Sequence, residues 1–234
     1  ENLPSTNVLA KELLQSGASE GTLVITDNQT DGRGRANRKW FTEPFKNLTF
    51  SIIIKPKINL ERIGCLSLYA GLCVAEAIEK ITVLRLVCKW PNDLLLNGKK
   101  ICGILSEAVF EYNQLKGIVI GGGINVNQRV CSAEVQSTAS SLSLETGSEH
   151  DTVSVLASVV ERMEDNYRFI QQGNIEQIIE RWKQRTTMFG QTVTVHQEKK
   201  KITGIATRLD DDGGLILVTS NGEHPSCLFI VNPF

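Results

Sequence analysis

The 234-residue sequence lacks several features that define whole classes of protein. No apolar run approaches the roughly 18 residues that a membrane-spanning helix needs, and the first residues do not have the pattern of a secretory signal. The chain has only three histidines and no Cys-x-x-Cys pair, so neither a metal-ligand set nor a Ser-His-Asp arrangement has support in the sequence. A net charge of −1 gives no overall attraction to nucleic acid or membrane. We therefore expect a cytoplasmic protein.

The six cysteines indicate a reduced core and not a disulfide framework. Most of them lie among valine, leucine and isoleucine, where a free thiol behaves as a small hydrophobic side chain. They are Cys65, Cys73, Cys88, Cys102, Cys131 and Cys227. The composition, 41% hydrophobic and 22% charged, is ordinary for a globular protein with one main core and a small second module.

The most informative stretch runs from Lys89 to Leu105. Apolar residues on both sides of Asn97-Gly98 predict a hairpin, because this dipeptide accepts the positive φ angles of a type I′ turn. Neighbouring strand residues face opposite sides, so Lys100 can point inward while Lys99 points outward. An inward ammonium needs a negative partner, which a bound carboxylate or phosphate would supply. The alternative is that both lysines are solvated at an exposed turn.

Residues 27–40 show no hydrophobic periodicity and are predicted to form a loop. Gly32 and Gly34 allow the backbone to approach a phosphate closely, and Trp40 is an aromatic anchor. Positive charge comes from Arg33, Arg35, Arg38 and Lys39. Such a loop can order around a small anionic ligand, but similar loops bind nucleic acid or stay solvated.

Two further polar segments flank predicted elements. Ser5-Thr6-Asn7 precedes a helix, where one of the three side chains caps the helix and the others can meet a ligand beside the backbone N–H groups. Gly121-Gly122-Gly123 follows a predicted strand and leads to Asn125, which can contact an adenine or a phosphate. This run lacks the spaced glycines and the helix of a dinucleotide-binding fingerprint.

The coarse pattern predicts an α+β fold. Strands are expected at 22–26, 48–55, 84–89 and 117–120 besides the hairpin, and helices at 60–81, 153–172 and 175–185, with a mobile loop at 131–148. We expect residues 1–186 to form a mixed sheet with helices on one face. Short strands at 192–195, 202–209, 215–219 and 227–231 then predict a small β-barrel over residues 187–234.

In this order, the segments resemble the biotin protein ligases over essentially the whole chain. The resemblance is carried by Ser5-Thr6-Asn7, Gln29, Gly32-Arg33-Gly34-Arg35, Arg38-Lys39-Trp40, Lys89-Trp90-Pro91-Asn92-Asp93, Lys99 to Leu105 and Gly121 to Asn127. It implies a catalytic domain like those of class II synthetases, followed by an SH3-like barrel. It also implies a two-step reaction: ATP and biotin give biotinyl-5′-AMP and pyrophosphate, and biotin then passes to one lysine of a biotin carboxyl carrier protein.

The resemblance implies a role for each matching residue. Biotin would be bound by Ser5, Thr6, Asn7, Gln29, Gly32, Arg33, Gly34, Arg35, Lys100 and Gly103. ATP and the adenylate would be bound by Arg33, Arg35, Trp40, Asn92, Lys100 and Asn125, with Lys100 and Arg33 as catalytic residues. Magnesium is expected with ATP, but its ligands are not identified. Asp93 is either one of them or a hydrogen-bond partner of the acceptor lysine.

Some positions depart from the family pattern. Asn37 stands where relatives often have glycine. Relatives commonly carry a glycine-glutamate pair and a late arginine near the ATP phosphates in the C-terminal module, but neither the spacing from Gly-Glu to the strand nor the arginine is present here. We therefore assign no catalytic residue to that module. The few residues before Ser5 could not form the DNA-binding winged helix of some relatives, so DNA is not an expected partner.

Other functions remain open. A lipoate ligase or octanoyl transferase would use the same fold with another acyl substrate, and a nucleic-acid-binding protein would use the arginine loop. The transferase chemistry needs a nucleophilic cysteine, whereas the cysteines here lie in apolar runs. A homodimer is one option for the oligomeric state.

Overall fold

The computed structural model describes residues 2–129, 137–197 and 200–226 of the chain. Its central feature is a six-stranded sheet with the order β2-β4-β8-β7-β6-β5, in which all neighbouring strands are antiparallel. The strands are β2 (Leu23–Thr26), β4 (Leu48–Ile54), β5 (Val87–Lys89), β6 (Asp93–Leu96), β7 (Lys99–Glu111) and β8 (Gln114–Ile124). Parallel pairing occurs between two short strands, β1 (Asn2–Leu3) and β3 (Asn28–Gln29).

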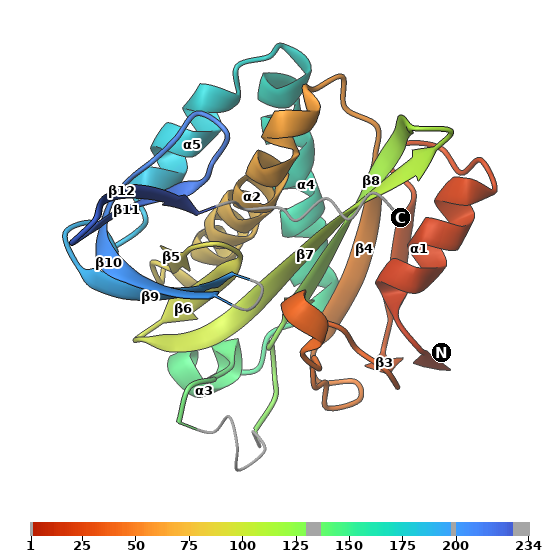
Figure 1. Ribbon diagram of the computed structural model, residues 1–234. Coiled ribbons are helices and arrows are strands. Elements are labelled where there is room, and N and C mark those ends of the chain that lie inside the picture. The colour runs from red at the N-terminus through yellow and green to blue at the C-terminus, as the bar shows by residue number, and fades with distance from the viewer. Residues whose placement is uncertain (1, 130–136, 198–199, 227–234) are drawn as a thin grey trace.

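One face of this sheet carries the main core. The buried side chains of Phe50, Ile52 and Ile54 join a large hydrophobic cluster with three helices. These are α2 (Cys65–Thr82), which follows the 3₁₀ turn η2 (Leu60–Gly64), α4 (Thr152–Gln171) and α5 (Ile175–Lys183). Figure 1 shows α2 and α4 running side by side along the sheet. The predicted α+β architecture is therefore confirmed.

The prediction that helices cover one face needs a correction. Helix α1 (Thr6–Gln15) packs on the opposite face, where Ala10 and Leu14 meet Val24, Ile53 and Val119 in a second hydrophobic cluster. The reason is visible in β4, a strand whose residues are all buried. Alternate side chains point to opposite faces, so both faces of such a strand need a cover.

The predicted hairpin is present. Asn97 and Gly98 have φ angles of 50° and 78° and join β6 to β7, as the type I′ interpretation requires. The glycine run differs from its prediction, because Gly121, Gly122 and Gly123 lie inside β8 and not beyond its end. In the segment predicted as a mobile loop, residues 142–146 form the short helix α3 (Leu142–Thr146), whose N-cap Ser141 accepts from Leu144 N; residues 131–136 lie outside the described part.

The C-terminal part is a small antiparallel sheet with the order β12-β11-β10-β9. Its strands are β9 (Thr192–Gln197), β10 (Lys200–Leu209), β11 (Leu215–Thr219) and β12 (Gly222–Ser226). The first three match predicted strands, β12 was missed, and the strand predicted at 227–231 lies outside the described residues. The sheet is tied to the rest of the chain by Trp90, whose Nε1 donates to Gly213 O at 3.0 Å.

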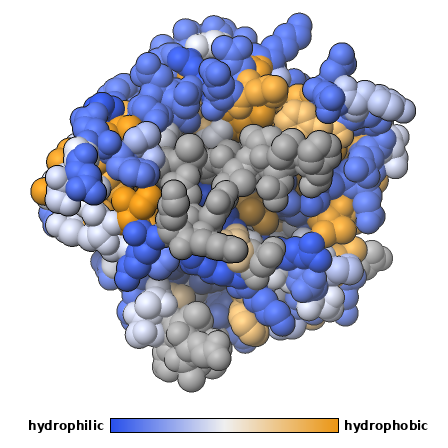
Figure 2. All heavy atoms as spheres, viewed as in Figure 1, coloured by the Kyte–Doolittle hydropathy of each residue, from blue (hydrophilic) through white to orange (hydrophobic). Residues whose placement is uncertain are grey.

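The surface is predominantly polar on the side drawn in Figure 2, with hydrophobic residues in separate patches. Within the described ranges, no helix is both long and apolar enough to cross a membrane.

Candidate active site

Trp40 lies on the α1 face of the sheet, next to several of the predicted site residues. Gly103 and Gly123 face each other across β7 and β8, and Trp40 packs on both. A Cβ atom at Gly123 would lie 2.4 Å from Trp40 Cε2, and one at Gly103 would lie 3.0 Å from Trp40 Cζ3. These glycines therefore create the flat surface on which the indole rests.

Lys100 lies beside this indole. Its Nζ is 5.3 Å from the centroid of the Trp40 ring and 2.6 Å from Asp93 Oδ1, and its side chain is 32% exposed. The predicted inward ammonium thus has a negative partner, and that partner is the carboxylate of Asp93. The Lys100 backbone is also fixed, because its N–H donates to Thr138 O and its carbonyl accepts from Ser140 N.

The Gly-Arg loop has its own folded shape. Gly34 N donates to Arg38 O at 2.7 Å and Trp40 N donates to Gly32 O at 2.9 Å, so the loop returns on itself around the 3₁₀ turn η1 (Arg35–Asn37). Gly32 has no room for a side chain, since a Cβ atom there would lie 2.4 Å from Trp40 O. These contacts position Trp40.

The two arginines of this loop differ in environment. Arg33 forms an exposed ion pair with Asp31 at 3.0 Å. Burial lowers the pKa of Arg35, and the negative charge of Asp93 acts in the opposite direction. Asp93 therefore faces two cations, Lys100 in direct contact and Arg35 through its electrostatic field. The charge of Arg35 is thus influenced by Asp93, whereas Arg33 is paired with Asp31.

A polar cluster surrounds the start of α1. Ser5 is the N-cap residue but makes no side-chain capping bond, and Ser5, Thr6 and Asn7 are all buried. Gln29 Oε1 accepts from Thr6 N at 2.8 Å, which ties the Gly-Arg loop to the helix N-terminus. Ser51 Oγ, on β4, lies 2.8 Å from Thr6 Oγ1 and 2.6 Å from Asn7 Oδ1.

The two asparagines predicted to contact ATP both hold backbone carbonyls. Asn92 Nδ2 donates to Ile104 O at 2.6 Å, and Asn125 Nδ2 donates to Ser140 O at 2.9 Å. Both residues border the Lys100 region, Asn92 across the hairpin and Asn125 through the segment that pairs with the Lys100 backbone. Their amide nitrogens order this part of the site, and contact with ATP stays a prediction.

Sequence reasoning missed three residues of the cluster: Lys11, Ser51 and Glu107. Glu107 Oε2 accepts from Asn7 Nδ2 at 2.7 Å, and Glu107 Oε1 pairs with Lys11 Nζ at 2.8 Å. In the sequence, Ser51 is a hydroxyl residue that directly precedes three isoleucines in β4. Glu107 is a carboxylate in the interior of strand β7. The sequence alone does not show which side chain either residue contacts, because that depends on the register of the sheet.

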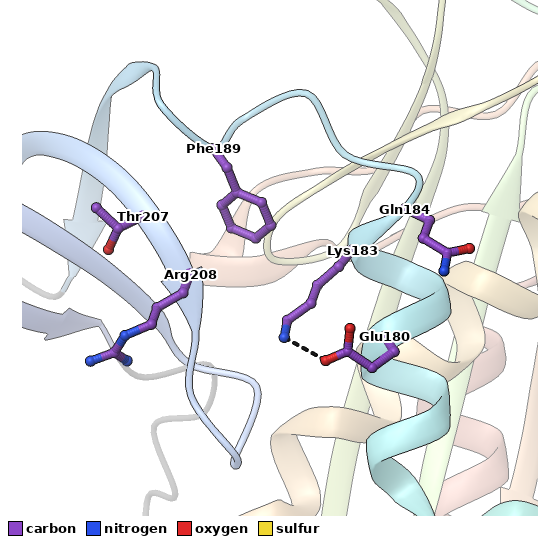
Figure 3. A pocket seen from close by; sticks show the side chains of 6 residues that line it. All are labelled: Glu180, Lys183, Gln184, Phe189, Thr207 and Arg208. Atoms are coloured by element: carbon purple, nitrogen blue, oxygen red, sulfur yellow. Dashed lines mark hydrogen bonds and ion pairs between the residues drawn. The ribbon is translucent and has the colours of Figure 1, made fainter.

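The structure has a separate pocket of about 340 Å³ between α5 and the C-terminal sheet. Figure 3 shows Lys183 and Glu180 of α5 paired on one side and Phe189, Thr207 and Arg208 on the other. None of its lining residues belongs to the group around Lys100. The pocket and the Lys100 group are therefore distinct.

The four cysteines in the described ranges are free and buried. Burial raises the pKa of Cys65, Cys73 and Cys88 to about 12 and also raises that of Cys102. Such thiols carry almost no thiolate at neutral pH, so none of the four is suited to be a nucleophile.

Both the main part and the C-terminal part of the chain match known protein families. Residues 1–125 match the biotin/lipoate A/B protein ligase family, and residues 188–227 match the biotin protein ligase C-terminal domain. The bifunctional ligase/repressor BirA of Bacillus subtilis is 35% identical over 94% of this chain and 68% of its own length. The biotin–[acetyl-CoA-carboxylase] ligase of Paracoccus denitrificans is 30% identical over 91% of this chain and 90% of its own.

A solved structure resembles the whole fold. The biotin protein ligase of Aquifex aeolicus, in complex with biotin and ATP, has a TM-score of 0.83 and 32% identity, covering 97% of this chain and 93% of its own. The chain belongs to the biotin/lipoate A/B protein ligase family. Within it, the chain is a biotin protein ligase, as the matches to relatives with that activity and to the C-terminal domain show.

Proposed function

We propose that the group around Lys100 is where this biotin protein ligase joins biotin to ATP and then passes biotin to a carrier lysine. The observation that carries the proposal is the placement of Lys100 beside Trp40, with its ammonium already fixed by Asp93 at 2.6 Å. An oxygen of the biotin carboxylate bonds to the α-phosphorus, the bond to the bridging oxygen breaks, and pyrophosphate leaves. A carrier amine then attacks the acyl carbon, loses a proton, and AMP leaves.

Lys100 suits the first step because that step brings two anions together. A fixed positive charge lowers the repulsion between the carboxylate and the phosphate and stabilises the charge that grows on the phosphate oxygens. Lys100 is held at its backbone by Thr138 and Ser140 and at its ammonium by Asp93, so little reorganisation is needed when substrates bind. Arg35, which experiences the charge of Asp93, supplies a second cation.

The other proposed roles are assigned from the positions of the residues around Lys100 and at the start of α1. Biotin's polar end is assigned to Ser5, Thr6, Asn7 and Gln29, and its carboxylate to the region of Lys100 and Gly103. Adenine is assigned to Trp40, with Asn92 and Asn125 ordering its surroundings, and Arg33 swings from Asp31 to the phosphates. The Gly-Arg loop, with Gly32 and Gly34, closes over the adenylate and keeps water from the mixed anhydride.

Magnesium would enter this site bound to the phosphates of ATP. Among the described residues, no group of three or more His, Cys, Asp or Glu side chains is placed to hold a metal ion. Asp93, the candidate ligand, is engaged with Lys100. We therefore assign the ion to the ATP phosphates, where it would offset their charge, and leave the orientation of the acceptor lysine as the alternative role of Asp93.

The partner is proposed from the relatives. The proteins of Paracoccus denitrificans and Mycobacterium tuberculosis that match this chain are named biotin–[acetyl-CoA-carboxylase] ligases. We infer that the acceptor is the biotin carboxyl carrier protein of a biotin-dependent carboxylase, in the cytoplasm, where the buried free thiols stay reduced. A homodimer remains part of the proposal and is tested by sedimentation.

The division into residues 1–186 and 187–234 is likewise proposed. It is supported by the pairing of β9 to β12 with one another and by the separate family match at residues 188–227.

The decisive experiment is ATP–pyrophosphate exchange by the purified chain with biotin, lipoate or octanoate. Biotin-dependent exchange is expected, followed by biotinylation of a carrier protein but not of its acceptor Lys→Arg variant. Exchange with lipoate alone would show that the substrate is lipoate and not biotin, without contradicting the fold. Exchange with none of the three would contradict the proposed activity.

A further inference from the structure

The polar cluster at the start of α1 ends in a charged pair. Lys11 Nζ lies 2.8 Å from Glu107 Oε1, and Asn7 Nδ2 donates to the other oxygen, Oε2, at 2.7 Å. The side chains of Lys11 and Glu107 are 31% and 32% exposed, whereas Asn7 is 5% exposed. Glu107 therefore joins a buried amide to a cation near the surface.

This pair determines which way the Asn7 amide faces. A carboxylate only accepts hydrogen bonds, and so does the carbonyl of Leu105, which Asn7 Nδ2 contacts at 3.2 Å. With the nitrogen committed to these acceptors, Asn7 Oδ1 faces Ser51 Oγ at 2.6 Å. An amide rotated by half a turn would set its oxygen against two other oxygens.

The orientation of the Asn7 amide in turn affects the hydrogen bonds of the other residues proposed to bind biotin. Ser51 has one proton, and the amide oxygen of Asn7 can only accept, so that proton is directed at Asn7. Ser51 Oγ is also oriented to donate to Thr6 Oγ1, at 2.8 Å, but its contact with Asn7 is the shorter of the two. The Thr6 hydroxyl donates to Gln29 Oε1 at 3.3 Å. Thr6 N in turn donates to Gln29 Oε1 at 2.8 Å, which leaves Gln29 Nε2 on the side of Gly32.

Packing prevents the Asn7 amide from moving away from this arrangement. A Cβ atom at Gly121 would lie 2.1 Å from Asn7 Oδ1, so the amide is pressed directly against the backbone of β8. Asn7 consequently has contacts on three sides: Glu107 and Leu105 at its nitrogen, Ser51 at its oxygen and Gly121 beneath it.

We propose that Glu107, neutralised by Lys11, is a positioning residue that sets the donor and acceptor pattern of the biotin-binding side chains. The inference rests on the proposed function, in which Thr6, Asn7 and Gln29 receive the polar end of biotin. A ureido group presents one acceptor between two donors, so its affinity depends on which atom each protein side chain turns toward it. Glu107 acts on that affinity through Asn7 and touches no substrate.

The same strand offers a matched control. Glu111, also on β7, pairs with Lys116 at 2.9 Å, and Lys116 Nζ donates to Gln15 O at the far end of α1. This pair joins the same helix to the same sheet region, but the contacts of the ammonium lead to the C-terminal end of the helix. If these ion pairs only fastened α1 to the sheet, breaking either one would have the same effect on biotin binding.

The test compares Glu107→Gln with Glu111→Gln. Biotin Kd is measured by calorimetry and the KM for ATP by pyrophosphate exchange. Glu107→Gln is expected to raise the biotin Kd about tenfold and leave the ATP KM unchanged, because its amide cannot accept from Asn7 and Lys11 at once. Glu111→Gln is expected to change neither. Equal biotin Kd values for the two variants would overturn the inference.

Two further comparisons test the same inference independently. If Glu107→Gln does not fold, Lys11→Met keeps the carboxylate, and we expect it to raise the biotin Kd several-fold relative to Lys116→Met. A double-mutant cycle with Asn7→Ala separates positioning from stability: in that background, Glu107→Gln should change the biotin Kd less than twofold. Full additivity would contradict action through Asn7. A wild-type chain that fails to bind biotin would overturn the proposed function itself.

Discussion

Lys100 and Asp93 form an ion pair of 2.6 Å across the β6–β7 hairpin, next to the Trp40 ring. The register places Asp93 opposite Gly103 and Lys100 opposite Leu95, so the two side chains approach each other diagonally across the ladder. Because the side chains are only 32% and 25% exposed, each charge limits the cost of partly burying the other. The hairpin therefore holds an ammonium in position before any substrate arrives.

The first prediction concerns this lysine. Lys100→Ala should lower biotinyl-adenylate formation by roughly 10² or more, the size of effect expected when a preorganised electrostatic stabiliser is removed. The measurement is biotin-dependent ATP–pyrophosphate exchange. Lys99→Ala is the control, since Lys99 is exposed on the neighbouring position of the same strand. Activity of Lys100→Ala within a few-fold of wild type would exclude a catalytic role for this residue.

The second prediction concerns the Gly-Arg loop. Arg35→Gly should weaken the closed loop and release biotinyl-AMP, so that lysines of bystander proteins become biotinylated. Arg35 is the arginine whose pKa reflects both burial and the charge of Asp93, whereas Arg38 is exposed and serves as the control variant, Arg38→Gly. Labelling of a non-carrier protein is detected with streptavidin. An Arg35→Gly enzyme that makes adenylate yet labels only the carrier would count against the lid.

Local chemistry explains what the sequence predicted well. The Asn97-Gly98 turn, the long apolar helix and the first three C-terminal strands depend on neighbouring residues, and each appears where it was expected. The family motifs also pointed to Lys100, whose role in the reaction stays a prediction. What motifs could not reveal was that Lys100 is paired with Asp93 before a ligand binds.

Long-range register explains what was missed. Glu107 lies 100 positions from Asn7 along the chain, and only the β7–β8 pairing and the packing of α1 bring them to 2.7 Å. The glycine run was interpreted as a place for a ligand, but Gly121, Gly122 and Gly123 make room for Asn7, Phe50 and Trp40 of the protein itself. Such contacts depend on three-dimensional neighbours that no local pattern encodes.

The third prediction follows from this glycine run. Gly121→Ala would place a Cβ atom 2.1 Å from Asn7 Oδ1, and Gly123→Ala would place one 2.4 Å from Trp40 Cε2. The first variant should raise the KM for biotin by about tenfold or more, and the second should raise mainly the KM for ATP. Steady-state exchange kinetics with each substrate varied in turn measure both. The control is Gly71→Ala in α2, whose Cβ atom would have only ordinary contacts, the nearest at 3.8 Å.

An outcome in which Gly121→Ala and Gly123→Ala raise both KM values alike would contradict the separate biotin and adenine regions. It would indicate instead that both substitutions disturb the sheet as a whole.

The fourth prediction concerns thiol reactivity. Burial raises the pKa of Cys65, Cys73 and Cys88 to about 12, so at pH 8 the thiolate that reacts with iodoacetamide is scarce. The native protein should therefore leave these three cysteines unmodified, as shown by mass spectrometry of their peptides. In urea, where the pKa returns to its ordinary value, all three should react. Rapid native alkylation at pH 8 would contradict their assignment to the core.

The last prediction links the C-terminal sheet to the site. Trp90 Nε1 donates to Gly213 O at 3.0 Å, and Trp90 comes just before the Pro91-Asn92-Asp93 segment that holds Lys100. Trp90→Phe keeps most of the buried ring but removes this donor and leaves the Gly213 carbonyl without it, which should cost about 1–3 kcal/mol.

A loss of this size should lower the thermal midpoint by several degrees and increase proteolysis between the two sheets. Arg208→Gln is the control, because it breaks an exposed pair with Glu223 at 3.0 Å on the same C-terminal sheet and should change stability by less than about 1 kcal/mol. Since Asp93 follows Trp90 closely, exchange activity should fall as well, by less than in Lys100→Ala. An unchanged midpoint with lower activity would place the role of Trp90 in the hairpin alone and not in docking the C-terminal sheet.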